Sequence, residues 1–209
     1  ALSQVAELTI DQMLLQSKSL GYDLQGLVPR ILKQNPTQLN NIPTFSVVIV
    51  GGGAAGISVA SSLLSRQSNL DIAVIDPAEI HYYQPGWTMV GGGIFAPEKT
   101  VRTMASLIPK QVHWIKAAVA AFDPDNKQVL LEGCKPINYE VLVVCPGLKL
   151  NWHGIEGLVE TLGKNGVTSN YRYDLAPYTW DLVRNMKQGK AVFTQPPMPI
   201  KCAGAPQKA

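Results

Sequence analysis

Two apolar runs separated by a helical pattern organise the middle of this chain. The first, Phe45 to Val50, is uncharged and rich in β-branched residues, which is typical of a buried parallel strand. From Ala54 to about Gln67, apolar residues recur at helical spacing, namely at Ile57, Ala60, Leu63 and Leu64. The second run, Leu70 to Ile75, predicts another buried strand. This order indicates an α/β fold with a Rossmann-like parallel sheet.

The turn between the first strand and the helix is Gly51-Gly52-Gly53-Ala54-Ala55-Gly56. Its glycine spacing matches the fingerprint of a dinucleotide-binding turn. Gly51 would permit the tight turn, Gly53 would let a pyrophosphate approach the backbone, and Gly56 would let helix and strand pack closely. The helix N-terminus would add N–H groups and a partial positive charge.

An aspartate completes the fingerprint. Asp76 ends the second strand, twenty residues after Gly56, where a carboxylate would bind a ribose hydroxyl. The alternative reading is an ordinary α/β turn followed by a surface aspartate. The coincidence of strand, turn, helix and carboxylate favours a dinucleotide.

The rest of the chain predicts further elements. They are an irregular stretch (77–97), a helix (99–108), a strand (112–119), a strand (127–131) paired with a later one across a turn at Gly133, a buried strand (141–145), a helix (178–186) and a strand starting at 191–194. The strand over 141–145 runs into Pro146-Gly147, a sharp turn that a flavin- or nucleotide-binding domain would place near its ligand.

These elements suggest a division of the chain. Residues 1–33 predict two short helices, which are too small to enclose a core and resemble the tail of a larger upstream domain. Residues 34–43 are polar and bracketed by prolines, as in a linker. We expect a Rossmann-like domain over 44–190 and the start of a second, truncated domain of dinucleotide-binding type over 191–209.

Composition and charge narrow the classes of function. The 209 residues are 46% hydrophobic, enough for a sizeable core. The net charge of +3 is not gathered into a basic stripe with aromatics, so we expect no nucleic-acid partner. No apolar stretch approaches the roughly 18 residues that cross a bilayer. The three cysteines and three histidines lack metal-ligand spacing, so neither a zinc site nor a disulfide scaffold is expected.

Three segments together resemble one enzyme family. They are Val50 to Gly53, His81 to Thr88 and Pro199 to Lys208. Residues 45–208 resemble the N-terminal portion of the sulfide:quinone oxidoreductases, FAD-dependent flavoproteins with two dinucleotide-binding domains, in their mitochondrial and related bacterial forms. The third segment is the most specific, because a cysteine in this proline- and glycine-rich frame is nearly a signature of the family.

The resemblance implies roles for single residues. Gly51, Gly53, Ala54 and Ala55 would hold the FAD pyrophosphate, with Gly56 completing the same cofactor-binding turn. Asp76 would bind the adenosine ribose, Gln84 would contact the ligand from the irregular loop, Val119 would lie on the adenine side, and Gly147 would form the turn beside the cofactor. Many relatives have glutamate in place of Asp76, so the carboxylate here reaches one methylene less far. Cys145-Pro146-Gly147 stands where related flavoproteins often have Ala-Thr-Gly or Ala-Leu-Gly, so a threonine contact is lost.

Cys202 would be the redox cysteine. A thiolate is the nucleophile in disulfide and persulfide exchange, and the adjacent Lys201 favours the thiolate. In the family, sulfide opens a bond between two cysteines and leaves a persulfide on one of them, and reduced FAD passes the electrons to quinone. The alternative for Cys202 is a small buried hydrophobe. For Cys134 and Cys145 such a structural role is the favoured reading.

The resemblance also implies partners and a location. Sulfide and quinone would be the substrates, and the complete protein would lie at the surface of the bacterial inner membrane, or alternatively of the mitochondrial one, with a homo-oligomer left open. The second cysteine, the quinone pocket and the membrane-binding segment of the family lie downstream. We therefore expect the 209 residues alone not to turn over.

Other readings stay open. A pyridine-nucleotide oxidoreductase, such as a type II NADH dehydrogenase or a disulfide reductase, is disfavoured because no CxxxxC pair follows the second strand and prolines follow the strand at 191–194. A non-catalytic FAD-binding module is the other rival. The aromatic residues His81, Tyr82, Tyr83 and Trp87 would either pack their loop onto the domain or line the flavin's edge.

The N-terminal residues carry a second resemblance. Leu8 to Asp11, Gly21 to Leu24 and Leu27 to Arg30 look like the end of a β-lactamase-hydrolase-like domain of tyrosine-phosphatase fold, which some bacterial sulfide oxidoreductases carry in fusion. The catalytic loop of that domain would precede Ala1. A free helical arm is the alternative on composition.

Overall fold

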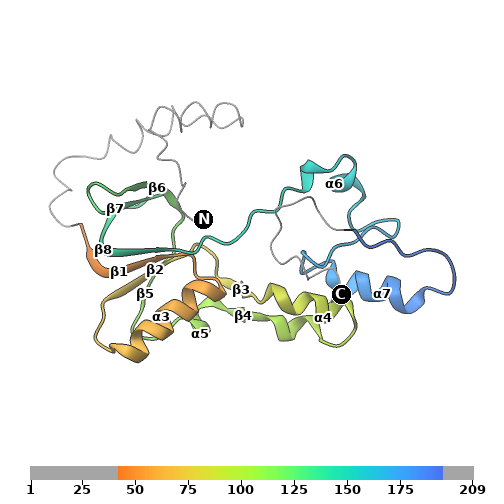
Figure 1. The fold of residues 1–209 in the computed structure, drawn as a ribbon, viewed down its shortest axis with the longest axis horizontal. Helices are drawn as coiled ribbons and strands as arrows, with labels where there is room; N and C mark the ends of the chain where they lie inside the picture. The colour runs from red at the N-terminus through yellow and green to blue at the C-terminus, as the bar shows by residue number, and fades with distance from the viewer. Residues whose placement is uncertain (1–41, 195–209) are drawn as a thin grey trace, which may run out of the picture. The chain divides into compact units, whose positions relative to one another are not determined.

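The structure, a computed structural model, describes residues 42–194 (Figure 1). The expectations for residues 1–33, for most of the linker and for the segment with Cys202 lie outside the described residues. The strands are β1 (Thr44–Val50), β2 (Ile72–Ile75), β3 (Ile80–Tyr82), β4 (Val101–Thr103), β5 (His113–Ile115), β6 (Val119–Asp123), β7 (Gln128–Leu131) and β8 (Ile137–Val144). The helices are α3 (Ala54–Arg66), α4 (Trp87–Gly91), α5 (Met104–Leu107), α6 (Leu158–Thr161) and α7 (Ala176–Asn185), with short 3₁₀ turns η2 (Gln84–Gly86), η3 (Pro97–Thr100) and η4 (Trp152–Gly154).

Six strands form one sheet in the order β5-β2-β1-β8-β7-β6. The first four run parallel, with Val48 opposite Ala73 on one side and Leu142 on the other. β7 and β6 continue the sheet as antiparallel neighbours, and β7 pairs with β8 across the turn at Gly133, as predicted. The α/β class with a Rossmann-like parallel sheet is confirmed, and the antiparallel pair extends it.

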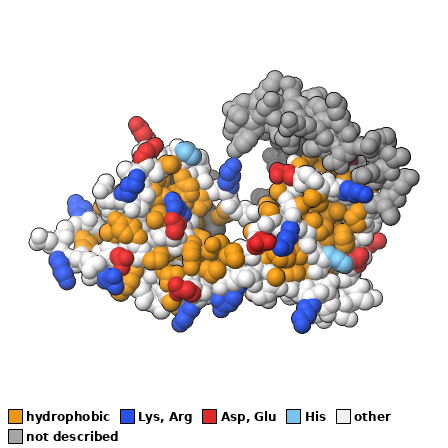
Figure 2. Space-filling model, turned by 180° about the vertical axis from the view of Figure 1, so that it is seen from behind, with side chains coloured by type: hydrophobic (Ala, Val, Ile, Leu, Met, Phe, Trp, Pro, Cys, Tyr) orange, Lys and Arg blue, Asp and Glu red, His pale blue; other side chains and the backbone are white. Residues whose placement is uncertain are grey.

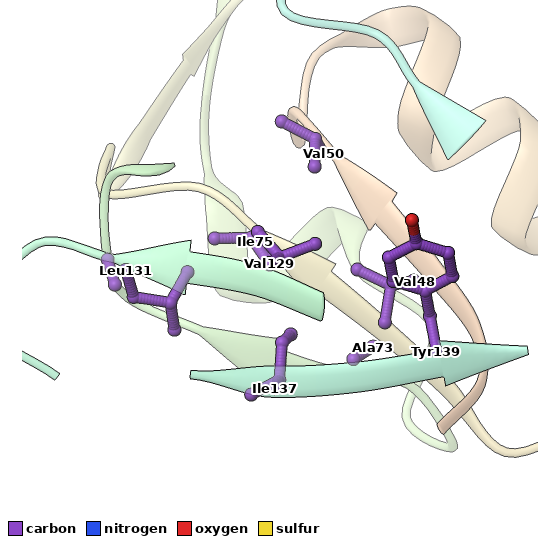
Figure 3. Packing of buried hydrophobic residues seen from close by; sticks show 9 residues of the cluster. Val48, Val50, Ala73, Ile75, Val129, Leu131, Ile137 and Tyr139 are labelled. Atoms are coloured by element: carbon purple, nitrogen blue, oxygen red, sulfur yellow. The ribbon is translucent and has the colours of Figure 1, made fainter. Parts of the chain in front are cut away.

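Successive side chains of a strand point to opposite faces of the sheet, and in β2 and the second half of β1 both faces are buried. One face packs under α3 and α5, and its buried residues are Val47, Ile49, Ala60, Ile72, Val74, Met104, Ile108 and Val112. The other face packs against β7 and the start of β8 (Figure 3), and its buried residues are Val48, Val50, Ala73, Ile75, Ala117, Val129, Leu131, Ile137 and Tyr139. Burial on two faces explains why β1 and β2 are continuous apolar runs.

The strand predicted over 112–119 is divided in two. β5 ends at Ile115 and β6 begins at Val119, and they occupy opposite ends of the sheet order. Between them the N–H of Ala117 donates to the carbonyl oxygen of Ile115 at 2.9 Å, which takes the chain out of the parallel ladder. The apolar pattern continues through this point because the residues on both sides of it are packed, so the pattern did not reveal the break.

The stretch over 77–97 is more regular than predicted, and 99–108 is less helical. β3 and β4 form an antiparallel pair in which Ile80 lies opposite Thr103 and Tyr82 opposite Val101. α4 follows β3 and packs against α7. Each of these short elements depends on a partner distant in sequence, which local patterns do not show.

Two expectations near the end of the described chain are wrong. The strand over 141–145 was expected to be buried, but Val141 and Val144 are 54% and 51% exposed. Beyond Asn138, only β1 pairs with β8 among the described residues. Residues 191–194 form no strand, since no neighbouring strand pairs with them in the described part of the chain. Figure 2 shows other apolar side chains gathered on the surface between scattered charges.

Candidate cofactor site

Four parallel strands end at one edge of the sheet, and the predicted site residues follow their ends. The N–H of Gly51 donates to the carbonyl oxygen of Ile75 at 2.9 Å, and that of Cys145 donates to Val50 at 2.7 Å. On the next strand, the N–H of Asp76 donates to the carbonyl oxygen of Ile115 at 3.1 Å. These bonds bring the glycine turn, Asp76 and the start of Cys145-Pro146-Gly147 to the edge where α/β proteins bind nucleotides.

Two glycines make the turn possible. Gly51 has φ +99°, and a Cβ there would lie 2.1 Å from the carbonyl oxygen of Cys145. A Cβ on Gly56 would lie 1.8 Å from the carbonyl oxygen of Gly51 and 3.3 Å from Cγ2 of Ile49. The first observation fits a tight turn, and the second fits close packing of α3 onto the turn and β1, as the spacing predicts.

The N-terminus of α3 presents free backbone donors. Gly53 occupies the N-cap position with extended backbone and no side-chain cap, and the first turn carries no acidic residue. The first helical bond runs from the N–H of Ile57 to the carbonyl oxygen of Gly53 at 3.0 Å, so the preceding N–H groups have no partner within the helix. Gly53, Ala54 and Ala55 are exposed, and no atom lies within 4 Å of a Cβ on Gly53. An anion can therefore reach these N–H groups.

The half-buried carboxylate of Asp76 is held on both oxygens. Oδ2 accepts a hydrogen bond from the N–H of Gly52 at 2.7 Å, and Oδ1 accepts one from the N–H of Ala78 at 2.8 Å. A Cβ on Gly52 would lie 3.0 Å from Cβ of Asp76, so this buried glycine also lets the strand end approach. An ionised carboxylate has about four acceptor positions. Two therefore remain for other donors, such as ribose hydroxyls.

Trp114 and Lys116, which the sequence did not indicate as site residues, contact the segment that carries this carboxylate. The indole N–H of Trp114 donates to the carbonyl oxygen of Asp76 at 2.9 Å. Nζ of Lys116 lies 4.5 Å from the centroid of the Trp114 ring and donates to Oε1 of Glu79 at 2.8 Å. This hydrogen bond, and then the charge of Lys116, lowers the pKa of Glu79. The only signal in the sequence was that Trp114 precedes the end of a predicted strand.

The other predicted ligands lie at separate places. Gly147 is exposed with φ +76°, two residues beyond Cys145. Val119 begins β6 opposite Leu131 and packs against the core. Gln84 begins η2 and is half-buried. Contacts of these three with a cofactor stay predictions, as does the role of Cys202.

Two free cysteines belong to the described chain. Cys134 is exposed beside the turn between β7 and β8, and Cys145 is half-buried at the end of β8. These locations do not decide what the two cysteines do, so a structural role for both stays a prediction.

Tyr82 and Trp87 pack against each other and against Tyr173, which lies far along the chain. Trp87 is buried, its ring centroid lies 6.0 Å from that of Tyr82 and 6.2 Å from that of Tyr173, and the two tyrosine rings lie 4.9 Å apart. Nε1 of Trp87 is buried and has no hydrogen-bond partner in the described part of the chain. Tyr83 remains 52% exposed and His81 is half-buried. Packing therefore accounts for Trp87 and Tyr82, and the exposed ring of Tyr83 is available to a ligand.

The arrangement fits the ADP part of a dinucleotide. Exposed N–H groups at the start of α3 suit a pyrophosphate, and a carboxylate with free acceptor positions stands at the end of the adjacent strand. A shallow hollow along α3, lined by Ser58, Val59, Ser62, Leu63 and Arg66, includes none of these groups. The site is thus an open edge of the sheet within the described residues.

Comparisons with known proteins agree with this arrangement. Residues 45–192 match the family model described as pyridine nucleotide-disulphide oxidoreductase. The chain is 49% identical over 164 residues to the mitochondrial sulfide:quinone oxidoreductase of Dictyostelium discoideum and 38% identical to that of Mus musculus, matching 78% of this chain and 36% of each relative. The solved sulfide:quinone oxidoreductase of Aquifex aeolicus is similar with a TM-score of 0.55 and 28% identity, over 68% of this chain and 32% of that one. The chain thus spans about a third of these relatives' length.

Proposed function

Since this chain belongs to the pyridine nucleotide-disulphide oxidoreductase family, we propose that it is the FAD-binding portion of a sulfide:quinone oxidoreductase. The observation that carries the proposal is the pairing of the glycine turn with Asp76, together with 49% identity to a protein of that name. FAD contains an ADP moiety, which needs both a pyrophosphate site and a ribose site. The described edge offers donors for the first and acceptors for the second.

The chain's own residues divide the binding task. The N–H groups at Gly53, Ala54 and Ala55 bind the pyrophosphate, and the absence of a side chain at Gly53 lets it come close. Asp76 accepts hydrogen bonds from the adenosine ribose. Val119 lies on the adenine side of the cofactor, Gln84 contacts the cofactor from the loop over 77–97, and Gly147 forms the turn beside it.

Cys202 carries the sulfur chemistry in this proposal. Hydrosulfide attacks a disulfide between Cys202 and a second cysteine of the complete protein, which leaves a persulfide on one sulfur and a thiolate on the other. Bound FAD supplies the acceptor for the electron pair and the route to quinone. Lys201 favours the thiolate form by its positive charge.

A quinone substrate places the reaction at a membrane surface, because quinones with long apolar tails reside in the bilayer. Among residues 42–194, no helix is long and apolar enough to cross a bilayer. We propose peripheral attachment of the complete protein, at the bacterial inner membrane or the mitochondrial inner membrane.

A second candidate is a flavoprotein that oxidises NADH, because the chain belongs to the pyridine nucleotide-disulphide oxidoreductase family. The experiment is anaerobic reduction of the complete, FAD-loaded protein by either sulfide or NADH, followed by visible absorbance. Bleaching by sulfide and not by NADH supports the proposal. Bleaching by NADH alone favours the second candidate, and bound flavin reduced by neither favours a non-catalytic module.

A further inference from the structure

We propose that Trp114 is a positioning residue for the ribose-binding carboxylate of Asp76, and that its indole N–H thereby sets the preference for a hydroxylated ribose. The inference rests on the proposed function, since it takes Asp76 as the ribose ligand. It assigns a role to a residue that the dinucleotide fingerprint does not contain.

The parallel ladder between β2 and β5 stops at Asp76. Ile75 lies opposite Ile115, and the N–H of Asp76 still donates to the carbonyl oxygen of Ile115. In a continued parallel ladder, the carbonyl oxygen of Asp76 would accept from the N–H of Ala117. That N–H instead donates to Ile115 at 2.9 Å, as the chain turns toward β6.

The indole of Trp114 replaces the missing ladder donor. Its Nε1 lies 2.9 Å from the carbonyl oxygen of Asp76. A partly buried carbonyl without a donor is unfavourable, so the peptide between Asp76 and Pro77 would otherwise shift, through ψ of Asp76, toward another donor. Because that peptide leads through Pro77 to Ala78, whose N–H donates to Oδ1 at 2.8 Å, its displacement would also move the carboxylate.

The Trp114 ring is itself held in place. One side packs against the cluster under α3 and α5. Nζ of Lys116 lies 4.5 Å from the ring centroid and also pairs with Glu79, three residues beyond Asp76. The segment from Asp76 to Glu79 is thus held at the carbonyl oxygen of Asp76 and at the side chain of Glu79. The carboxylate of Asp76 then faces the glycine turn, where it accepts the hydrogen bond from Gly52.

The test compares two ligands that differ only in the ribose hydroxyls. Binding of ADP and of 2′,3′-dideoxy-ADP to the flavin-free complete protein is measured by calorimetry, for the parent protein, Trp114→Phe and the matched control Trp152→Phe. Hydrogen bonds to a carboxylate predict that the parent prefers ADP by about 10-fold or more. We expect Trp114→Phe to reduce this preference at least about 3-fold while affinity for the dideoxy ligand stays within about 2-fold, and Trp152→Phe to leave the preference unchanged.

A second substitution separates the loss of the N–H from a loss of packing. Benzothienylalanine at position 114 keeps the shape of the bicyclic ring and removes only the N–H, and it should reduce the preference as Trp114→Phe does. An unchanged preference in either variant, or equal weakening of both ligands, would overturn the role of Trp114. If the parent protein itself binds ADP without preference, or does not bind it, the ribose site of the proposed function fails and the inference fails with it.

Discussion

The backbone N–H of Gly52 lies 2.7 Å from Oδ2 of Asp76 and joins the glycine turn to the end of the neighbouring strand. The turn would bind the pyrophosphate and the strand end would bind the ribose. This hydrogen bond would therefore hold the two proposed subsites of the dinucleotide in place relative to each other.

Replacement of Asp76 tests that link. Asp76→Ala removes the acceptor for Gly52 and for the ribose, and should raise the Kd for FAD about 10-fold to 100-fold, since a hydrogen bond to a charged group contributes about 1.5–3 kcal/mol. Asp76→Asn keeps one oxygen and should fall between the parent and Asp76→Ala. Quenching of flavin fluorescence measures the Kd. Parent-like binding by Asp76→Ala would exclude this carboxylate as a ligand.

Two glycine substitutions should separate binding from folding. Gly53→Ala places its Cβ in open space on extended backbone, so the free energy of unfolding should stay within about 0.5 kcal/mol while FAD binding weakens at least about 10-fold. Gly56→Ala meets the carbonyl oxygen of Gly51 at 1.8 Å and should lower the free energy of unfolding by about 3 kcal/mol or more. Urea unfolding and FAD titration measure the two effects. A stable Gly56→Ala protein would contradict the close packing of α3 onto the glycine turn.

The sequence predicts the residues of the candidate site that follow one another along the chain. It does not predict the residues whose partners are distant in sequence. Gly51, Gly56 and Asp76 could be predicted because a strand, a turn and a helix follow one another along the chain. Trp114 could not, because its partner lies 38 residues away and the bond depends on where the β5 ladder stops. For the same reason the strand over 191–194 was predicted wrongly, since apolar residues form a strand only beside a partner.

Trp87 offers a test of an unpaired donor. Its buried Nε1 has no partner among residues 42–194, so Trp87→Phe removes no hydrogen bond there and should lower the free energy of unfolding only through the packing lost with the smaller ring, by about 1 kcal/mol. Tyr173→Ala, which removes ring contacts with Trp87 and Tyr82, should cost more, about 1–3 kcal/mol. Urea unfolding of both variants gives the comparison. A loss above about 3 kcal/mol for Trp87→Phe would exceed the packing loss and indicate that its N–H is bonded.

The pair Lys116–Glu79 should make stability depend on pH in acid. Lys116 lowers the pKa of Glu79, so the pair contributes above the ordinary glutamate pKa, and the contribution is lost as pH falls through the lowered value. The difference in Tm between the parent and Lys116→Met should therefore be largest near neutral pH and shrink in acid. The double variant Lys116→Met with Glu79→Gln serves as the control, because it lacks the titrating group. A difference that grows as the solution becomes acidic would contradict the assignment.

The most direct measurement for the proposed sulfide chemistry is the visible absorbance of FAD bound to the complete protein when sulfide is added without oxygen. The parent protein and Cys134→Ser, whose cysteine is exposed beside a turn, should bleach. Cys202→Ser should hold its FAD and keep the absorbance of the oxidised flavin. Bleaching of Cys202→Ser at the rate of the parent would contradict the account.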